Sequence, residues 1–290
     1  MNSHPRRSLV HRKLLGSGLL ASPAILMIVV LLAIPLVQMF DASLRQEEFG
    51  VLLPGFTLDN YRQILGSGQY FEIFYKTGGI ALLVTLLCGL LGFPVALLIV
   101  AAKPHHKAIL YFLVTAPLLI NTVVRSYGWL LMLGNRGVIN AMLMSLGLTS
   151  SPIPLSGNVL GLVIGATQVF LPFMILSLVA SLETIDRKLL ESADILGAGR
   201  TRTFFDITLP LAMPGLIGGS VLVFSLMLGA IITPLMLGGT AIKYLSVSIY
   251  TDALVLFNLP RATALSVVLL CVVFALYALQ RRFVRSYKER

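Results

Sequence analysis

The sequence predicts an all-α, polytopic membrane protein with six transmembrane helices. Of its 290 residues, 57% are hydrophobic and only 12% are charged. A soluble domain carries about 25% charged residues, so this chain has too few polar side chains to cover a water-soluble globule. Six apolar segments also reach the roughly 20 residues that a helix needs to cross about 30 Å of hydrocarbon. They lie near residues 19–40, 73–102, 108–133, 158–181, 211–238 and 262–280.

These segments divide the chain in order. We expect an N-terminal segment over 1–18, an uncleaved first helix over 19–40, an outer loop over 41–72, a five-helix core over 73–280 and a tail over 281–290. Asp59 and Asn60, which follow Thr57, predict the start of a short helix in the outer loop. Several spans contain a proline, which membrane helices tolerate because neighbouring groups satisfy the freed backbone. These are Pro23, Pro35, Pro94, Pro117, Pro172 and Pro234.

The placement of positive charge predicts the orientation. Cytoplasmic loops of membrane proteins carry an excess of lysine and arginine. A cytoplasmic N-terminus puts most of the 22 basic residues inside, including those of the 103–107 loop and the C-terminal tail. We therefore expect a multi-pass protein of the inner (plasma) membrane, in contact with lipid and with both termini cytoplasmic. The net charge of +10 does not indicate nucleic-acid binding, because the basic residues lie at helix ends and not on one soluble face.

A polar loop over 182–210, between the fourth and fifth expected spans, is the most informative stretch. Three apolar residues follow i, i+4, i+7 spacing, which gives a short helix one apolar face. Gly197 can end this helix because glycine tolerates positive φ, and Pro210 fits the first turn of the next helix. A helix resting on the lipid surface satisfies the same periodicity, so spacing alone leaves that alternative open. The three apolar residues are Leu189, Ala193 and Leu196.

The order of residues across this loop resembles the EAA loop of permease subunits of bacterial ATP-binding-cassette importers. The family pattern is Glu-Ala-Ala, three residues, glycine, nine residues, then Ile-x-Leu-Pro. The chain departs from it at Ser192, where alanine is usual, but the side chain stays small. The resemblance implies the type I importer permease fold, called MetI-like. The chain matches at Glu191, Ala193, Gly197, Ile207, Leu209 and Pro210.

The resemblance also implies roles and partners. The helix before the glycine would enter a groove on an ATPase subunit, where Glu191 makes a polar contact and Ala193 packs closely. Gly197 would set the turn, and Ser192 and Pro210 complete the set of coupling residues. Two ATPase subunits, which bind the ATP and Mg, a second homologous permease subunit and a periplasmic solute-binding protein would be the partners. The chain itself would need no cofactor.

Weaker similarities point to one solute class. Five stretches of the chain resemble spermidine/putrescine permease subunits, which predicts a polyamine such as spermidine or putrescine as the solute. Related permeases for ferric iron, opines and aminophosphonates share some of these stretches, so the same machine for another solute is the alternative. The stretches are Phe56–Tyr61, Asn121 with Arg125, Tyr127–Gly128, Asn140 and Leu171–Met174.

Catalytic motifs are missing from the sequence. There is no Gly-x4-Gly-Lys-Ser/Thr phosphate-binding loop, which predicts that ATP hydrolysis takes place on a partner chain. The histidines and cysteines show no metal-ligand spacing, so we expect no metal site and no enzyme activity. An ion-coupled secondary transporter is a rival class, but such proteins usually carry Asp, Glu or His within spans. No expected span has an acidic residue in its middle.

Four residues are candidates for the translocation path. Asn121, Arg125 and Trp129 follow i, i+4, i+8 spacing, which predicts one shared helical face. Gln168 lies in the middle of the fourth span. Each polar side chain has an alternative role in a structural hydrogen bond between helices. Arg125 is unexpected beside a polycationic solute, because no mid-span carboxylate accompanies it; an anionic solute would remove this conflict.

Overall fold

The computed structural model describes residues 6–48, 51–239 and 242–288, and nearly all of its regular structure is helical. Within these residues, five helices are long and apolar enough to cross a membrane, or six if one bent helix pair counts as a single span. The prediction of an all-α polytopic membrane fold is confirmed. The α-helices are α1 (Arg6–Ser43), α2 (Asp59–Gly66), α3 (Gly68–Ala101), α4 (Pro104–Thr115), α5 (Thr122–Leu133), α6 (Val138–Ser145), α7 (Val159–Leu182), α8 (Arg187–Ile195), α9 (Arg200–Thr203), α10 (Leu209–Leu228), α11 (Ile232–Leu237), α12 (Leu245–Leu254) and α13 (Leu259–Lys288).

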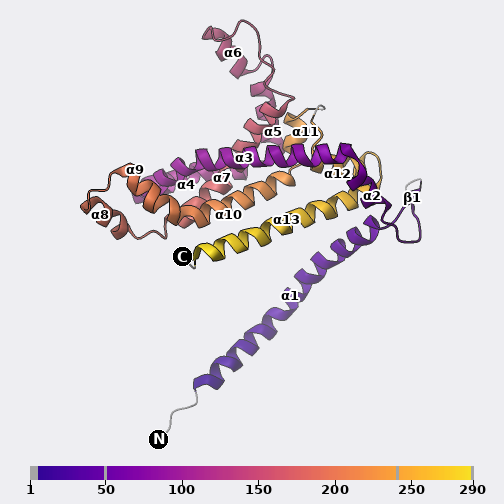
Figure 1. Ribbon diagram of the computed structural model, residues 1–290, viewed down its shortest axis with the longest axis horizontal. Coiled ribbons are helices and arrows are strands. Elements are labelled where there is room, and N and C mark those ends of the chain that lie inside the picture. Colours follow the sequence, from indigo (N-terminus) through magenta and orange to yellow (C-terminus); the bar gives the residue numbers. More distant parts are fainter. Residues whose placement is uncertain (1–5, 49–50, 240–241, 289–290) are drawn as a thin grey trace.

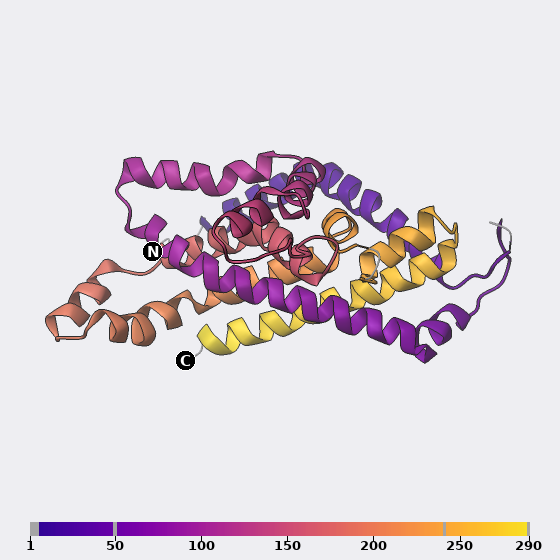
Figure 2. The same cartoon turned by 90° about the horizontal axis from the view of Figure 1, so that it is seen from above.

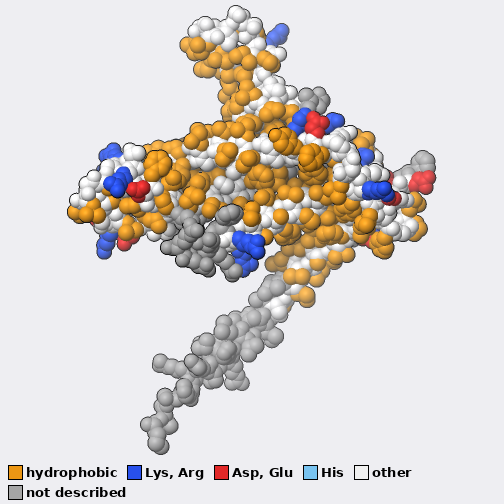
Figure 3. Space-filling view, in the orientation of Figure 1, with side chains coloured by type: hydrophobic (Ala, Val, Ile, Leu, Met, Phe, Trp, Pro, Cys, Tyr) orange, Lys and Arg blue, Asp and Glu red, His pale blue; other side chains and the backbone are white. Residues whose placement is uncertain are grey.

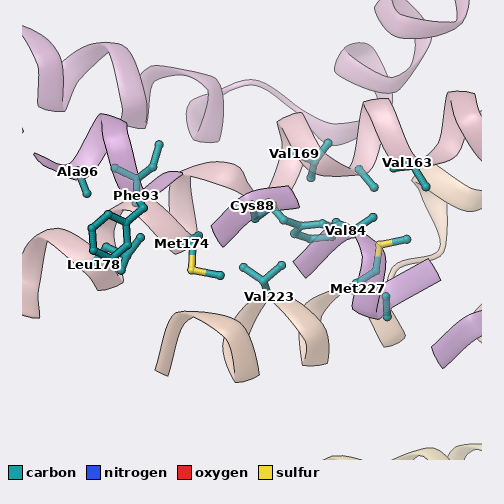
Figure 4. Packing of buried hydrophobic residues seen from close by; sticks show 14 of the residues in the cluster. Val84, Cys88, Phe93, Ala96, Val163, Val169, Met174, Leu178, Val223 and Met227 are labelled. Carbon is teal, nitrogen blue, oxygen red and sulfur yellow. The ribbon is translucent and has the colours of Figure 1, made fainter. Parts of the chain in front are cut away.

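Three long helices, α3, α7 and α10, form the core of the bundle (Figure 1). Val84 and Cys88 of α3, Met174 of α7 and Val223 of α10 all lie in one buried hydrophobic cluster (Figure 4). In lipid there is no hydrophobic driving force between helices, so they associate by close packing at small residues. Gly215 of α10 accordingly lies directly against the α7 backbone.

One end of the bundle, which we call the hairpin end, carries the short strands β1 (Glu47–Glu48) and β2 (Val51–Leu52) with α2. The expected helix at Asp59 is present, and Thr57 Oγ1 accepts from the Asp59 N–H at 3.1 Å. A carboxylate oxygen of Glu47 accepts from the N–H of Leu259 at 2.9 Å, which places a negative charge at the N-terminus of α13, where the helix dipole favours it. This contact ties the hairpin to the last helix.

The third expected span, 108–133, is present as a broken span and not as one straight helix. Its first part, Pro104–Leu119, consists of α4 and the 3₁₀ turn η1 (Ala116–Leu119), and its second part, Thr122–Ser145, of α5 and α6. The two parts are bent by 95°. The prolyl ring of Pro117 and the extended backbone of Ile120 end the first part. Asn121 then caps α5 with its side chain, so the chain leaves the bundle sideways through α5 and α6 (Figure 1).

The fifth expected span, 211–238, is also interrupted. Helix α10 ends at Leu228, and residues 229–231 separate it from the short helix α11. Gly229 is the C-cap of α10, and its N–H donates to the carbonyl of Ser225 at 3.3 Å. The apolar segment is therefore continuous in sequence but not in structure, and the hydropathy pattern could not show the break.

Hydrophobic side chains cover the length of the bundle in the space-filling view, as a membrane environment requires (Figure 3). Charged side chains gather beside α8 and α9, at what we call the loop end, and near α2 and β1 at the hairpin end. Only 6% of the residues in the α1 segment Leu26–Ser43 are buried. Helix α1 packs on α13 and diverges from the rest of the bundle (Figure 1).

Candidate functional site

The predicted coupling loop projects from the loop end of the bundle. Figures 1 and 2 show α8 and α9 beyond the ends of the core helices. Ile185 and Phe204 both pack against the main core cluster. The chain therefore leaves the bundle at Ile185 and returns to it at Phe204, and the segment between them is presented to the surroundings.

Helix α8 has a defined start and stop. A carboxylate oxygen of Asp186 accepts from the N–H of Lys188 at 3.0 Å, which caps the first turn. At the other end Gly197 has a φ of +77°, a conformation that other L residues rarely adopt. The N–H of Ala198 then reaches back to the carbonyl of Ala193 at 3.0 Å. The glycine stop predicted at this position is present.

The two faces of α8 differ. Glu191 is exposed, whereas Ala193 is buried with 7% of its surface accessible. Leu189, Ala193 and Leu196 line one groove of about 390 Å³ together with Ile207. The three apolar residues therefore share a side, as their spacing predicts, but Leu196 is 85% exposed in the isolated chain. An apolar groove beside an exposed carboxylate is a surface suited to a protein partner.

The helix after the glycine turn begins earlier than expected. Pro210 lies in the first turn of α10, but α10 continues α9 through the π-helical segment η2 (Phe204–Thr208). The three segments form one continuous stretch, Arg200–Leu228. A π segment inserts an extra residue into a helix and is frequent at functional sites. The returning arm of the coupling loop is thus rigidly joined to a transmembrane helix.

An ion pair fixes the start of α4 at the same end. The ammonium group of Lys107 lies 2.6 Å from a carboxylate oxygen of Glu183, and the Tyr111 hydroxyl donates to the same oxygen at 3.1 Å. The hydrogen bond from Lys107 holds the pKa of Glu183 below its ordinary value. This contact joins the residue that follows α7 to α4, immediately before the coupling loop begins.

The predicted face of Asn121, Arg125 and Trp129 does not exist as one helical face, because Asn121 lies outside the helix. Asn121 is the N-cap of α5 and its Oδ1 accepts from the Val123 N–H at 2.8 Å. Arg125 Nη1 donates to the carbonyl of Pro117 at 2.9 Å. Both side chains therefore stabilise the bend between η1 and α5, which corrects the expectation for Asn121.

Trp129 and Gln168 are brought together from different helices. The indole Nε1–H of Trp129 donates to Oε1 of Gln168 at 3.1 Å. This is the interhelical hydrogen bond that was the alternative to a role in the pathway, and it links α5 to α7.

The two helix breaks meet at one cavity of about 600 Å³. Leu118, Thr122 and Arg125 line it from the first break, and residues 229–233 line it from the second. Val169, which also lines it, lies ten residues from the start of α7, or about 15 Å along a helix of about 36 Å. The cavity is therefore near the middle of the span. Irregular backbone at membrane depth occurs where it is buried in protein or lines a water-filled cavity, so this cavity is a candidate part of the solute path.

Within the described residues, the cavity lining contains one basic side chain, that of Arg125, and no acidic one. Its Nε–H is buried and has no hydrogen-bond partner. Phe170, Phe173 and Tyr250 complete much of the wall. The arrangement offers a positive charge and aromatic surface to whatever occupies the cavity.

Sequence reasoning missed several of these residues. Pro117 and Gly229 are visible in the sequence as helix breakers within apolar runs, but membrane helices tolerate both residue types, so neither gave a usable signal. The Lys107–Glu183 pair joins positions far apart in the chain, and no local pattern reveals it. Phe204 stands among other apolar residues, and only its packing distinguishes it from Phe205.

This fold, with its projecting helix–glycine–helix loop between two core spans, is that of a membrane permease. A family model described as "Binding-protein-dependent transport system inner membrane component" matches residues 19–289. The chain belongs to this family and is a permease subunit of an ATP-binding-cassette importer of the inner membrane. ATP hydrolysis is the task of a partner subunit.

Individual relatives agree with the family. The chain is 33% identical over 211 residues to the spermidine/putrescine transport system permease protein PotB of Haemophilus influenzae, covering 73% of each chain. It is 38% identical over 185 residues to PotB of Escherichia coli, covering 63% of this chain and 66% of that protein. A solved bacterial alginate ABC transporter in complex with an alginate pentasaccharide-bound periplasmic protein is similar in fold. Its TM-score is 0.76 at 20% identity, over 97% of this chain and 96% of that one. The MetI-like permease fold is confirmed.

Proposed function

We propose that the chain forms part of the pathway of an importer for a polyamine such as spermidine or putrescine. A periplasmic binding protein delivers the solute, a second homologous permease subunit completes the pathway, and two ATPase subunits dock on the coupling loop. The loop end, with both chain termini, faces the cytoplasm in this proposal. The observation that carries it is the projecting loop between Ile185 and Phe204, with Glu191 exposed beside an apolar groove.

The residues have distinct tasks in this mechanism. Closure of the ATPase pair on ATP binding pulls α8 of each permease subunit inward. The continuous α9–η2–α10 segment carries this displacement into the bundle. Helix α10 packs tightly on α7 through Gly215, so both core helices move together. This movement changes the side of the membrane from which solute can reach the mid-membrane cavity. ATP hydrolysis and release of the products then return the helices to their starting positions.

The polyamine assignment is supported by the 33–38% identity to PotB proteins. An anionic or zwitterionic solute, such as an aminophosphonate, is the second candidate. One observation favours it: the mid-membrane cavity is lined by Arg125 with a free Nε–H, and its described lining has no acidic residue. Desolvating a polycation beside a guanidinium group is electrostatically unfavourable.

The experiment that tests the function is reconstitution of the complete complex in liposomes. Its binding protein is loaded in turn with spermidine, putrescine, ferric iron, an opine or 2-aminoethylphosphonate, and ATP turnover is compared. Stimulation by spermidine or putrescine supports the polyamine assignment, and stimulation by the phosphonate alone replaces it with the second candidate. A complex that transports solute with no ATPase subunit present contradicts the proposal itself.

A further inference from the structure

The contacts of α8 show how its motion reaches the membrane helices. The main packing partner of α8 is α9, and the groove beneath α8 is closed by Arg202 and Ile207 of the returning arm. A displacement of α8 is therefore passed first to the α9–η2 segment. The first apolar side chain of that segment to pack against the main core cluster is that of Phe204, at the start of the π helix.

Phe204 makes a specific contact with another helix. Its ring lies edge-on against the ring of Phe93, with centroids 5.4 Å apart and planes at 80°. Phe93 is buried in α3, next to the internal proline Pro94. Aromatic pairs favour this geometry, which adds to the effect of burial alone. The pair connects the coupling loop to a helix that does not itself carry the loop.

Neighbouring Phe205 provides a contrast within the same turn. It is 58% exposed and packs edge-on against Phe204 at 5.0 Å. An α-helix places consecutive residues about 100° apart, so only one of the two rings can face the core. Phe204 is the one that packs against the core.

We propose that Phe204 is a positioning residue that transmits the displacement of the coupling helix α8 to α3 through its edge-on contact with Phe93. This inference rests on the proposed function, in which a partner ATPase docks on α8. Without the Phe204 ring, α8 and α10 still move together, but the loop loses its aromatic contact with Phe93 of α3. ATP hydrolysis then becomes poorly linked to solute movement.

The test is Phe204→Ala in the reconstituted complex. We expect the ATPase subunits to bind with unchanged affinity and basal ATP turnover to persist. Solute-stimulated turnover and transport should both fall by about two- to tenfold, the range that corresponds to an edge-on ring contact. Phe204→Tyr should restore both, because its ring keeps the contact. Phe274→Ala, which removes a ring that is 64% exposed on α13, is the matched control and should leave both rates unchanged.

A second pair of variants separates this role from simple loss of packing. Phe93→Leu should reproduce the loss of stimulation, and the double variant Phe204→Ala/Phe93→Leu should be no worse than the single ones. Unchanged stimulation in Phe204→Ala, or additive losses in the double variant, overturns the inference. Loss of ATPase binding in Phe204→Ala also overturns it, because the residue would then be part of the docking surface. The proposed function fails separately, if Glu191→Lys leaves ATPase binding and transport intact.

Discussion

Trp129 and Gln168 join the sideways helix α5 to the core helix α7 through one hydrogen bond of 3.1 Å, from the indole N–H to the amide oxygen. Both residues were candidates for the solute path, and the contact gives each a structural partner. Hydrogen bonds between membrane helices contribute about 0.6 kcal/mol on average. A contribution of this size positions α5 without fixing it rigidly.

This pair can be tested by a double-mutant cycle. Trp129→Phe and Gln168→Leu should each lower the free energy of unfolding in detergent, and the double variant should show a coupling of about 0.6 kcal/mol. Chemical denaturation followed by circular dichroism measures it. Zero coupling would mean that the hydrogen bond contributes nothing and that the two side chains are free to contact solute.

The glycine turn after α8 gives a second prediction. Gly197→Ala should destabilise the coupling loop by about 1–2 kcal/mol, because a β-carbon is unfavourable at a φ of +77°. Gly197→Asp introduces the same unfavourable backbone conformation together with a negative charge. It should abolish transport while membrane insertion continues. Gly199→Ala is the control, because that glycine has a φ of −66° and open space around it. Equal transport by the Gly197→Asp and Gly199→Ala variants would contradict the prediction.

Glu191 is exposed in the isolated chain, so its charge is available to a partner. Glu191→Lys should leave folding unchanged within about 0.5 kcal/mol, as for most surface substitutions, yet abolish transport and ATPase binding. Co-purification with the ATPase subunit measures the docking directly. Ser192→Ala, which restores the usual residue of the family pattern, should retain both. Normal solute-stimulated ATP turnover in Glu191→Lys would exclude the coupling role.

Close packing between α7 and α10 predicts a difference between two glycines one turn apart. A β-carbon at Gly215 would lie 2.7 Å from the Ser177 carbonyl oxygen, whereas one at Gly218 would meet the nearest atom at 3.5 Å. Gly215→Ala should therefore cost about 1–3 kcal/mol by overpacking, and Gly218→Ala should be tolerated. Thermal unfolding in detergent compares them. Similar unfolding temperatures for both variants would show that the two helices separate readily.

The Lys107–Glu183 pair predicts a dependence on pH. The hydrogen bond from Lys107 lowers the pKa of Glu183, so its stabilising effect is fully present above the ordinary glutamate value of about 4.3. The effect is lost as the pH falls through the lowered pKa. Glu183→Gln should thus be slightly less stable than the parent chain at neutral pH, and the difference should vanish in acid. A difference that persists at low pH would mean that the ion pair is not its source.

Much of the fold could be predicted from the sequence because hydropathy and charge report on the membrane directly. The long apolar runs of α3 and α7 and the glycine at position 197 follow from local chemistry. The breaks at Ile120–Asn121 and at Gly229 do not, because apolar residues continue across both and only tertiary packing selects the bend. For the same reason Asn121 was assigned to a helical face, although its side chain is a cap.

The candidate site, like the fold, could be predicted from the sequence only in part. The coupling residues follow a fixed order along the chain, so sequence placed them together. The mid-membrane cavity and the Phe93–Phe204 contact combine residues from distant segments, and no spacing rule predicts such contacts. Arg125 was noticed because an arginine is costly within a span; that it donates to the Pro117 carbonyl became apparent only from the bend.

The π-helical segment also has a consequence for the length of the loop. Because each residue of a helix turns the chain by about 100°, removing a single residue from the helical stretch between Arg200 and Leu209 would rotate α8 about the axis of α10 by about that angle. Glu191 and the groove beside it would then face away from a partner, although every side chain of the docking surface remained. We therefore expect the number of residues in this stretch to matter for docking as much as the side chains of α8 do.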